Sequence, residues 1–157
     1  MIDRLPPHLA ERTRALGEPD PGRGEVVVYW MRFALRGHEN PALDVARHLA
    51  SACGLPLQVL SVVHGHHRFA SDRLHRFFLE AAREVAAELD ELGLAYACHL
   101  ERTAEPPTAL RRLAQRAALI VSEDMPTPDA RAGLALVGDA APLVLVDTAC
   151  TLPMRVS

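Results

Sequence analysis

The sequence contains no lysine, so all 17 of its basic residues are arginine, and the formal net charge is −3. This acidic balance argues against strong independent binding to DNA, because such binding needs a basic face to neutralise phosphates. Aromatic residues make up only 4% of the chain, so leucine, valine and alanine must fill the core. Apolar residues still account for 49% of the 157 positions, which is enough for the core of one ordinary domain.

Long apolar runs and paired cysteines are also missing. No run approaches the roughly 18 residues that a membrane-spanning helix needs, and the first residues lack the apolar stretch of a signal peptide. The three cysteines, Cys53, Cys98 and Cys150, are far apart and set among apolar neighbours. We therefore expect buried thiols in a reducing compartment rather than a disulfide framework. These absences predict a cytoplasmic protein without a membrane partner.

From residue 25 onwards, runs of β-branched and aliphatic residues alternate with stretches of helical periodicity. The predicted strands are residues 25–30, 55–63, 95–100, 119–122 and 143–147, and the predicted helices are 41–53, 72–92, one that follows residue 107, and 128–137. Strands that alternate with helices form a parallel sheet covered on both faces, with right-handed crossovers. The predicted fold class is α/β, a Rossmann-like three-layer α/β/α sandwich whose five-stranded parallel sheet has the order 3-2-1-4-5.

Residues 1–24, which precede the first predicted strand, are predicted to form an N-terminal extension. The pair Pro6-Pro7 predicts a short helix that runs through Leu16, and the glycines and prolines of residues 17–24 then end it.

In the predicted sheet the strand order reverses between the first and fourth strands. Ligands of open α/β sheets bind beyond the carboxyl ends of the strands at such a point. Trp30, Met31 and Arg32 leave the first strand there. Trp30 and Met31 offer a flat, polarizable surface to a ring, and Arg32 or Arg36 offers a cation to an anion. The alternative is that Trp30 packs in the core and that the arginines are solvated.

A second candidate segment follows the fourth strand at the same edge. It is followed in the sequence by Pro126 and consists of Ser122, Glu123, Asp124 and Met125, whose position at this edge suits ligand binding. The alternative is an ordinary strand-to-helix loop with a capping role.

Histidines form a third cluster, His64, His66 and His67, with His75 on the next helix. Imidazoles this close can bind zinc or nickel, but a metal site needs three or four converging ligands and no cysteine lies nearby. A solvated loop is therefore the expected structure. Glycine-rich phosphate loops and the G-x-S-x-G nucleophile elbow are absent, and no histidine–carboxylate pairing suits acid–base catalysis. We assign neither a catalytic residue nor a metal ligand.

Five landmarks, in the same order along the chain, resemble the start of DNA photolyases, closest to the class II branch and related bacterial photolyase-like proteins. They cover nearly the whole sequence and are Arg12-x-Arg14-Ala15-Leu16, the strand VVVYWM (26–31) with Arg32, Asn40 and Ala42-Leu43 after it, ASDRLHRF (70–77), VSEDMP (121–126) and VDTACTLP (146–153).

This resemblance implies the N-terminal α/β domain of a deoxyribodipyrimidine photolyase-like DNA-repair flavoprotein, at residues 25–153, with 154–157 beginning an interdomain linker. In that family a helical domain carries FAD, the DNA-binding surface and the electron-transfer tryptophans. This chain alone is therefore not expected to repair DNA, and damaged DNA is expected to be met only through the helical domain. The implied roles are docking on the helical FAD domain and holding an antenna chromophore, a deazaflavin or a folate. The implied chromophore residues are Trp30, Met31, Arg32 and Ser122 through Met125.

Two other functions are open. Universal stress proteins share this architecture and size, which suggests a free-standing nucleotide-binding module, but their loop G-x-x-G-x(9)-G-[ST] is missing from SEDMPTPDARAG (122–133). The other is a structural role, in which the face that would pack on the helical domain drives self-association instead.

Overall fold

A computed structural model of the chain describes residues 2–17, 20, 22–65, 70–102 and 108–154. Strands and helices alternate from residue 26 onwards, as predicted. The helical elements are the 3₁₀ turn η1 (Ile2–Arg4), α1 (Pro7–Ala10), α2 (Pro41–Cys53), α3 (Asp72–Glu91), α4 (Thr108–Arg116) and α5 (Pro128–Gly138). The strands are β1 (Thr13–Leu16), β2 (Val26–Met31), β3 (Leu57–His64), β4 (Ala95–Glu101), β5 (Ala117–Glu123) and β6 (Leu143–Val146).

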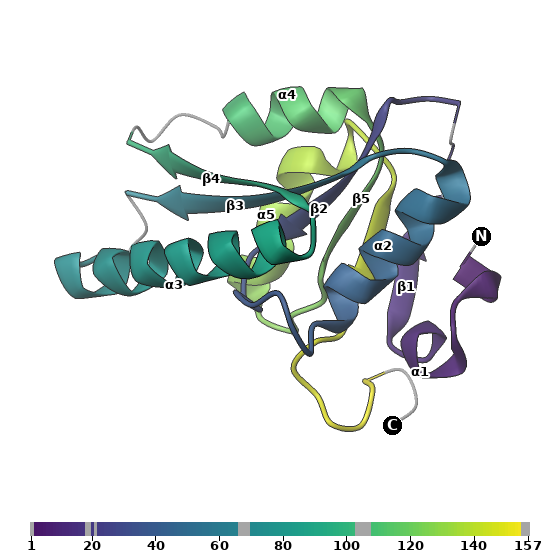
Figure 1. The fold of residues 1–157 in the computed structure, drawn as a ribbon, viewed down its shortest axis with the longest axis horizontal. Helices are drawn as coiled ribbons and strands as arrows, with labels where there is room; N and C mark the ends of the chain where they lie inside the picture. Colours follow the sequence, from purple (N-terminus) through teal and green to yellow (C-terminus); the bar gives the residue numbers. More distant parts are fainter. Residues whose placement is uncertain (1, 18–19, 21, 66–69, 103–107, 155–157) are drawn as a thin grey trace.

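These strands form one sheet in the order β1-β6-β5-β2-β3-β4 (Figure 1). The strands β2 to β6 pair in parallel, so the five predicted strands and their order are confirmed. The prediction of a purely parallel, five-stranded sheet is wrong, because β1 pairs antiparallel with β6 and makes the sheet six-stranded and mixed.

The sixth strand comes from the segment that was expected to be a helix through Leu16. The helix ends at Ala10, and Thr13–Leu16 instead pairs with Val146–Leu143. The physical reason is the apolar edge of β6, whose backbone groups would be unpaired without a neighbour. Arg12 strengthens this arrangement, since its Nη1 donates a hydrogen bond to the carbonyl oxygen of Asp147 at 3.0 Å. The boundary at residue 24 stays a prediction.

Two apolar cores flank the sheet, with α2 and α3 over one face and α4 and α5 over the other (Figure 1). Alternate residues of β2 enter different cores. Tyr29 and Met31 belong to the core beneath α2 and α3, whereas Val28 and Trp30 belong to the core beneath α4 and α5. The period of two along a strand therefore places Trp30 and Met31 on opposite faces.

The predicted start of α2 is confirmed in detail. Asn40 is the N-cap, where its Oδ1 accepts hydrogen bonds from the backbone N–H groups of Ala42 at 3.1 Å and Leu43 at 3.2 Å. Pro41 occupies the first turn, and Gly54 ends the helix with φ at 65°, a left-handed conformation that favours glycine.

No helix in the described part of the chain is long and apolar enough to cross a membrane. The three cysteines are unbridged, and Cys53 and Cys150 are half-buried. The expectation of three buried thiols is wrong, because Cys53 and Cys150 are only half-buried and Cys98 is exposed on the edge strand β4.

Candidate functional site

A cavity of about 550 Å³ opens at the carboxyl ends of β2 and β3, where α3 and α5 begin. Its lining is mainly apolar and contains three aromatic side chains together with one arginine and two histidines. The lining residues are Trp30, Arg32 and Phe33 from β2 and the loop after it, Val62, Val63 and His64 from β3, Leu74, His75 and Phe78 from α3, and Thr127, Asp129, Ala130, Gly133 and Leu136 around α5.

Arg32 forms one wall of the cavity by stacking between two rings. Its Cζ lies 4.5 Å from the ring centroid of Trp30 and 4.9 Å from that of Phe33, within the range of a cation–π contact. Its Nη2 donates to the carbonyl oxygen of Ala130 at 2.8 Å, and its Nη1 is buried without a hydrogen-bond partner among the described residues. Burial lowers the pKa of Arg32, and the nearby carboxyl of Glu123 acts in the opposite direction.

Gly133 provides the space for this guanidinium. A Cβ at position 133 would lie 2.7 Å from Nη2 of Arg32 and 3.9 Å from the Trp30 ring. In the sequence this glycine merely weakens the prediction of a helix over 128–137. In the structure α5 forms there, and the glycine allows the helix to approach Arg32.

Glu123, the last residue of β5, is fully buried beside the loop that follows β2. Its carboxyl accepts hydrogen bonds from the Tyr29 hydroxyl at 2.7 Å, from the Arg32 N–H at 3.0 and 3.2 Å, and from the Ala34 N–H at 3.3 Å. Burial raises the pKa of Glu123, and these hydrogen bonds only partly oppose it. The residue therefore connects β5 to the start of the loop.

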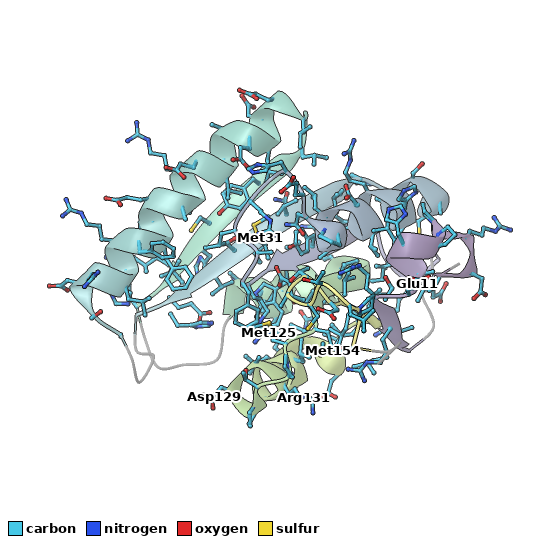
Figure 2. The ribbon with its side chains drawn as sticks, turned by 90° about the horizontal axis from the view of Figure 1, so that it is seen from below. Glu11, Met31, Met125, Asp129, Arg131 and Met154 are labelled. Carbon is cyan, nitrogen blue, oxygen red and sulfur yellow. The ribbon has the colours of Figure 1, made fainter. Side chains whose placement is uncertain are left out.

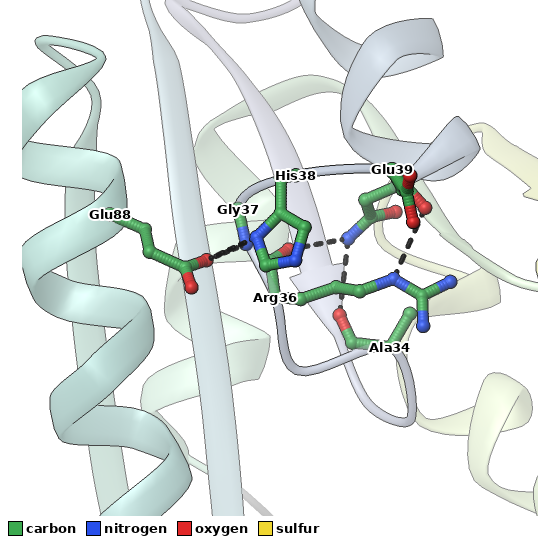
Figure 3. A network of polar contacts seen from close by, with 7 residues as sticks. Ala34, Arg36, Gly37, His38, Glu39 and Glu88 are labelled. Atoms are coloured by element: carbon green, nitrogen blue, oxygen red, sulfur yellow. Dashed lines mark hydrogen bonds and ion pairs between the residues drawn. The ribbon is translucent and has the colours of Figure 1, made fainter.

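Other side chains hold the rest of this loop (Figure 3). Nδ2 of Asn40 donates to the carbonyl oxygens of Ala34 at 3.1 Å and Arg36 at 3.0 Å. Glu88 of α3 accepts a hydrogen bond from the N–H of Gly37 and contacts Nδ1 of His38 at 3.3 Å. Residues 32–39 thus lack regular secondary structure but are tied to β5, α2 and α3.

The histidine cluster is divided between two elements. His64 ends β3, and its Nδ1 lies 2.7 Å from Oε2 of its cross-strand neighbour Glu101. His75 lies in the first turns of α3, and its buried Nε2 has no hydrogen-bond partner among the described residues. Within that part of the chain, no three His, Cys, Asp or Glu side chains are grouped to hold a metal ion. His66 and His67 lie outside the described residues.

The structure brings only two of the seven predicted chromophore residues, Trp30 and Arg32, into the cavity lining. Met31 is buried in the core on the opposite face of the sheet, and Ser122 donates its hydroxyl hydrogen bond to the Trp30 carbonyl oxygen at 2.9 Å. Glu123 is occupied by the loop, as described above.

The last two predicted residues, Asp124 and Met125, also lie outside the cavity lining. Asp124 forms an ion pair with Arg14 of β1 at 3.1 Å, and Met125 is half-buried. In Figure 2, Met125 is drawn apart from Met31. The described contacts of the second predicted segment are therefore with the sheet, its edge strand and the loop after β2, and none of its residues lines the cavity.

Sequence reasoning placed no residue of β3, α3 or α5 at the ligand site, and it considered His64 and His75 only as metal ligands. The sequence predicts that residues 62 and 63 end a strand and that residue 64 begins a solvated loop, although β3 ends at the same edge of the sheet as β2. Leu74 and Phe78 are four residues apart, so they share one face of α3. That spacing, combined with the predicted strand order, was the available signal.

Solved structures establish the class of fold. The structure of a universal stress protein from Archaeoglobus fulgidus in complex with dAMP superimposes with a TM-score of 0.52 at 20% sequence identity, covering 79% of this chain and 98% of that chain. Another universal stress protein structure from the same organism has a TM-score of 0.52 at 22% identity, covering 78% of this chain and 92% of that one. The protein is thus an α/β domain of this Rossmann-like class.

Sequence comparison establishes the family. Residues 27–149 match the family model described as DNA photolyase. The deoxyribodipyrimidine photo-lyase of Methanothermobacter thermautotrophicus strain Delta H is 36% identical over 115 residues, which cover 73% of this chain and 25% of that protein. The chain belongs to the DNA photolyase family and corresponds to its N-terminal α/β domain, which confirms the resemblance. It matches about a quarter of the length of this relative.

Proposed function

We propose that this domain docks on a helical, FAD-carrying domain of a photolyase and that its cavity holds an antenna chromophore, a deazaflavin or a folate. The observation that carries the proposal is the aromatic-walled cavity at the carboxyl ends of β2 and β3 in a chain that belongs to the DNA photolyase family. The proposal also includes the activity of the assembled protein, which would carry FAD, contact damaged DNA and repair it. It further includes a cytoplasmic location.

The cavity suits a flat ring system. Its volume of about 550 Å³ falls within the range of pockets that bind small molecules. Phe33 and Phe78 supply apolar ring surface, and Arg32 supplies a planar cation that is already stacked on Trp30. A chromophore bound there would lie beyond the carboxyl ends of β2 and β3, the edge of the sheet at which open α/β proteins bind their ligands.

Exposed apolar side chains support docking. Phe33 borders the cavity with 44% of its surface exposed, and Phe77 of α3 is 63% exposed next to the cavity residue Phe78. Leu152, which follows β6, is also 63% exposed. A helical domain that covered these side chains would remove them from water. The linker proposed at 154–157 starts beside Leu152, and its residues 155–157 lie outside the described residues.

The chromophore proposal is tested by titrating the purified chain with a deazaflavin and with a reduced folate, and by following the absorption band above about 350 nm. We expect one of the two to bind with one molecule per chain and a shifted absorption band. Phe78→Ala should weaken binding by about tenfold through lost ring contact. Its matched control is Phe77→Ala, because Phe77 is adjacent but does not line the cavity.

The proposal of an antenna fails if neither compound binds. ATP and dAMP belong in the same titration, since tight stoichiometric binding of either would favour the universal-stress-type nucleotide module instead.

The docking proposal is tested by co-expressing the chain with the helical domain of the Methanothermobacter photo-lyase. We expect a stable complex that repairs pyrimidine dimers in light, whereas either domain alone is expected not to do so. Two domains that elute separately and show no repair as a mixture would contradict it.

A further inference from the structure

We infer that Glu123 is a positioning residue of the cavity. Its buried carboxyl fixes the first residues of the loop after β2, which carry Arg32 and Phe33 into the cavity wall, and it does not itself contact a ligand. The inference rests on the proposed function only in taking this cavity as the chromophore site. The device itself is a property of the loop and can be tested without a chromophore.

The carboxyl group of Glu123 is closed off from the cavity by its own hydrogen-bond donors. Glu123 has no exposed surface, and its two oxygens receive hydrogen bonds from Tyr29, Arg32 and Ala34. A ligand in the cavity could reach Glu123 only by displacing these donors. The absence of Glu123 from the cavity lining is consistent with this arrangement.

The hydrogen-bond partners of Glu123 require an acceptor at this position. The Tyr29 hydroxyl and the backbone N–H groups of Arg32 and Ala34 all donate to the carboxyl group. An ionised carboxyl group is acceptor-only and satisfies all of them, whereas the amide of glutamine would turn N–H groups of its own toward donors. If position 123 only had to fill space at the end of β5, an apolar side chain would be enough, and no charged group would have to be desolvated. The need to hold the N–H groups of the loop therefore explains why position 123 carries a carboxyl group.

Different side chains hold the two halves of the loop after β2. Asn40 and Glu88 hold its later part, from Ala34 to His38 (Figure 3). The backbone N–H of Arg32 is held by Glu123. The loss of Glu123 should consequently release Arg32 and Phe33 while the rest of the loop stays attached to α2 and α3.

Trp30 is the only tryptophan in the chain, and Arg32 covers its ring, so its fluorescence reports the position of this loop. In Glu123→Gln we expect acrylamide to quench Trp30 about twice as efficiently as in the wild type, because the covering side chain is released. Glu88→Gln is the matched control, since it loosens the far part of the same loop and should leave the quenching unchanged.

A second measurement uses the wild-type chain alone. The N–H groups of Arg32 and Ala34 lie outside helices and strands, yet we expect slow hydrogen exchange at both because the buried carboxyl holds them. Unchanged quenching of Trp30 in a folded Glu123→Gln protein would overturn the inference. If that variant does not fold, exchange at unprotected rates for these two amides in the wild type would overturn it.

Chromophore binding separates this inference from the proposed function. If the wild type binds a chromophore, Glu123→Gln should weaken binding by about tenfold and reduce the visible circular dichroism of the bound chromophore, while Glu88→Gln should do neither. If the wild type binds neither compound, the antenna proposal fails, and the quenching and exchange measurements still decide the role of Glu123.

Discussion

The Cζ atom of Arg32 lies 4.5 Å from the ring centroid of Trp30, and the two residues form one wall of the cavity together. The contact joins the end of β2 to the loop that follows it. It compensates part of the cost of burying a guanidinium that forms no ion pair with any described residue. Variants that move this guanidinium should therefore alter the cavity more than they alter the fold.

Gly133→Ala is the smallest change that moves the Arg32 side chain. The added methyl group would lie 2.7 Å from Nη2, which is the far end of a flexible side chain and can shift. Alanine also favours helix over glycine, so we expect the free energy of unfolding to stay equal or to rise by about 0.5–1 kcal/mol. Trp30 fluorescence and chromophore affinity should both change. Urea unfolding and fluorescence spectra provide the measurements.

Ala135→Gly, at an exposed position of the same helix, is the matched control. It should lower the free energy of unfolding by about 0.5–1 kcal/mol and leave the Trp30 spectrum unchanged. An unaltered Trp30 spectrum in Gly133→Ala would show that the glycine does not govern the position of Arg32.

Glu123 should make stability depend on pH. Burial raises its pKa in the folded state above the value of about 4.3 expected in the unfolded chain. The folded protein then holds its proton more tightly, so the stabilising contribution is complete below about pH 4.3 and is lost as pH rises through the folded pKa. Glu123→Gln cannot titrate. We therefore expect the free energy of unfolding of the wild type, relative to this variant, to fall with rising pH.

Urea unfolding of both proteins between about pH 4 and pH 8 tests this linkage. Two curves that run parallel across the range would mean that the side chain at position 123 titrates alike in the folded and unfolded states.

Asp147 should make the free energy of unfolding depend on pH in the opposite direction to Glu123. Burial alone would raise its pKa, but hydrogen bonds from the backbone N–H groups of Cys150, Met154 and Ala149 outweigh it and lower the pKa. Its contribution is thus present above the unfolded value of about 3.9 and is lost as pH falls through the lowered folded pKa. Asp147→Ala leaves three N–H groups without their acceptor.

We expect Asp147→Ala to lower the free energy of unfolding by about 1–3 kcal/mol at neutral pH, with the deficit shrinking in acid. Asp139→Ala, which removes an exposed carboxylate after α5, should change stability by less than about 0.5 kcal/mol. Thermal unfolding at several pH values is the measurement, and equal stability of the two variants would refute the role given to Asp147.

Local signals explain why most of the fold was predictable. Asn40, Pro41 and Gly54 mark the two ends of α2, and the apolar strands predict a buried parallel sheet. The edge strand β1 was not predictable in this way. Its four residues form a strand because of β6, which lies about 130 residues away in the sequence, and no local pattern encodes that pairing.

The candidate site shows the same division. Trp30 and Arg32 follow from the end of a strand at the reversal of the strand order, which the sequence predicts. The polarity of Ser122, Glu123 and Asp124 does not reveal whether their partners are a ligand or the protein itself. In the structure these partners are the Trp30 carbonyl, the loop N–H groups and Arg14, which only the three-dimensional contacts can show.

The N-terminal segment provides the last prediction, because β1 and the helix before it cover one end of the sheet. Leu5 and Leu9 are buried in the core beneath α2, and β1 pairs with the wholly apolar β6. A chain that begins at Gly17 would lose Leu5, Leu9 and β1. The core side chains that they cover would become exposed, and β6 would become an unpaired edge strand. We expect a lower melting temperature and self-association, since unpaired apolar edges add strands from other molecules.

Leu9→Ala is the milder variant, expected to cost about 2–5 kcal/mol, and the exposed neighbour change His8→Ala is its control. Thermal unfolding and light scattering measure both effects. A truncated chain that melts like the full one and stays monomeric would show that residues 1–16 are a dispensable extension. In that case the pairing of β1 with β6 would contribute little to the stability of the sheet.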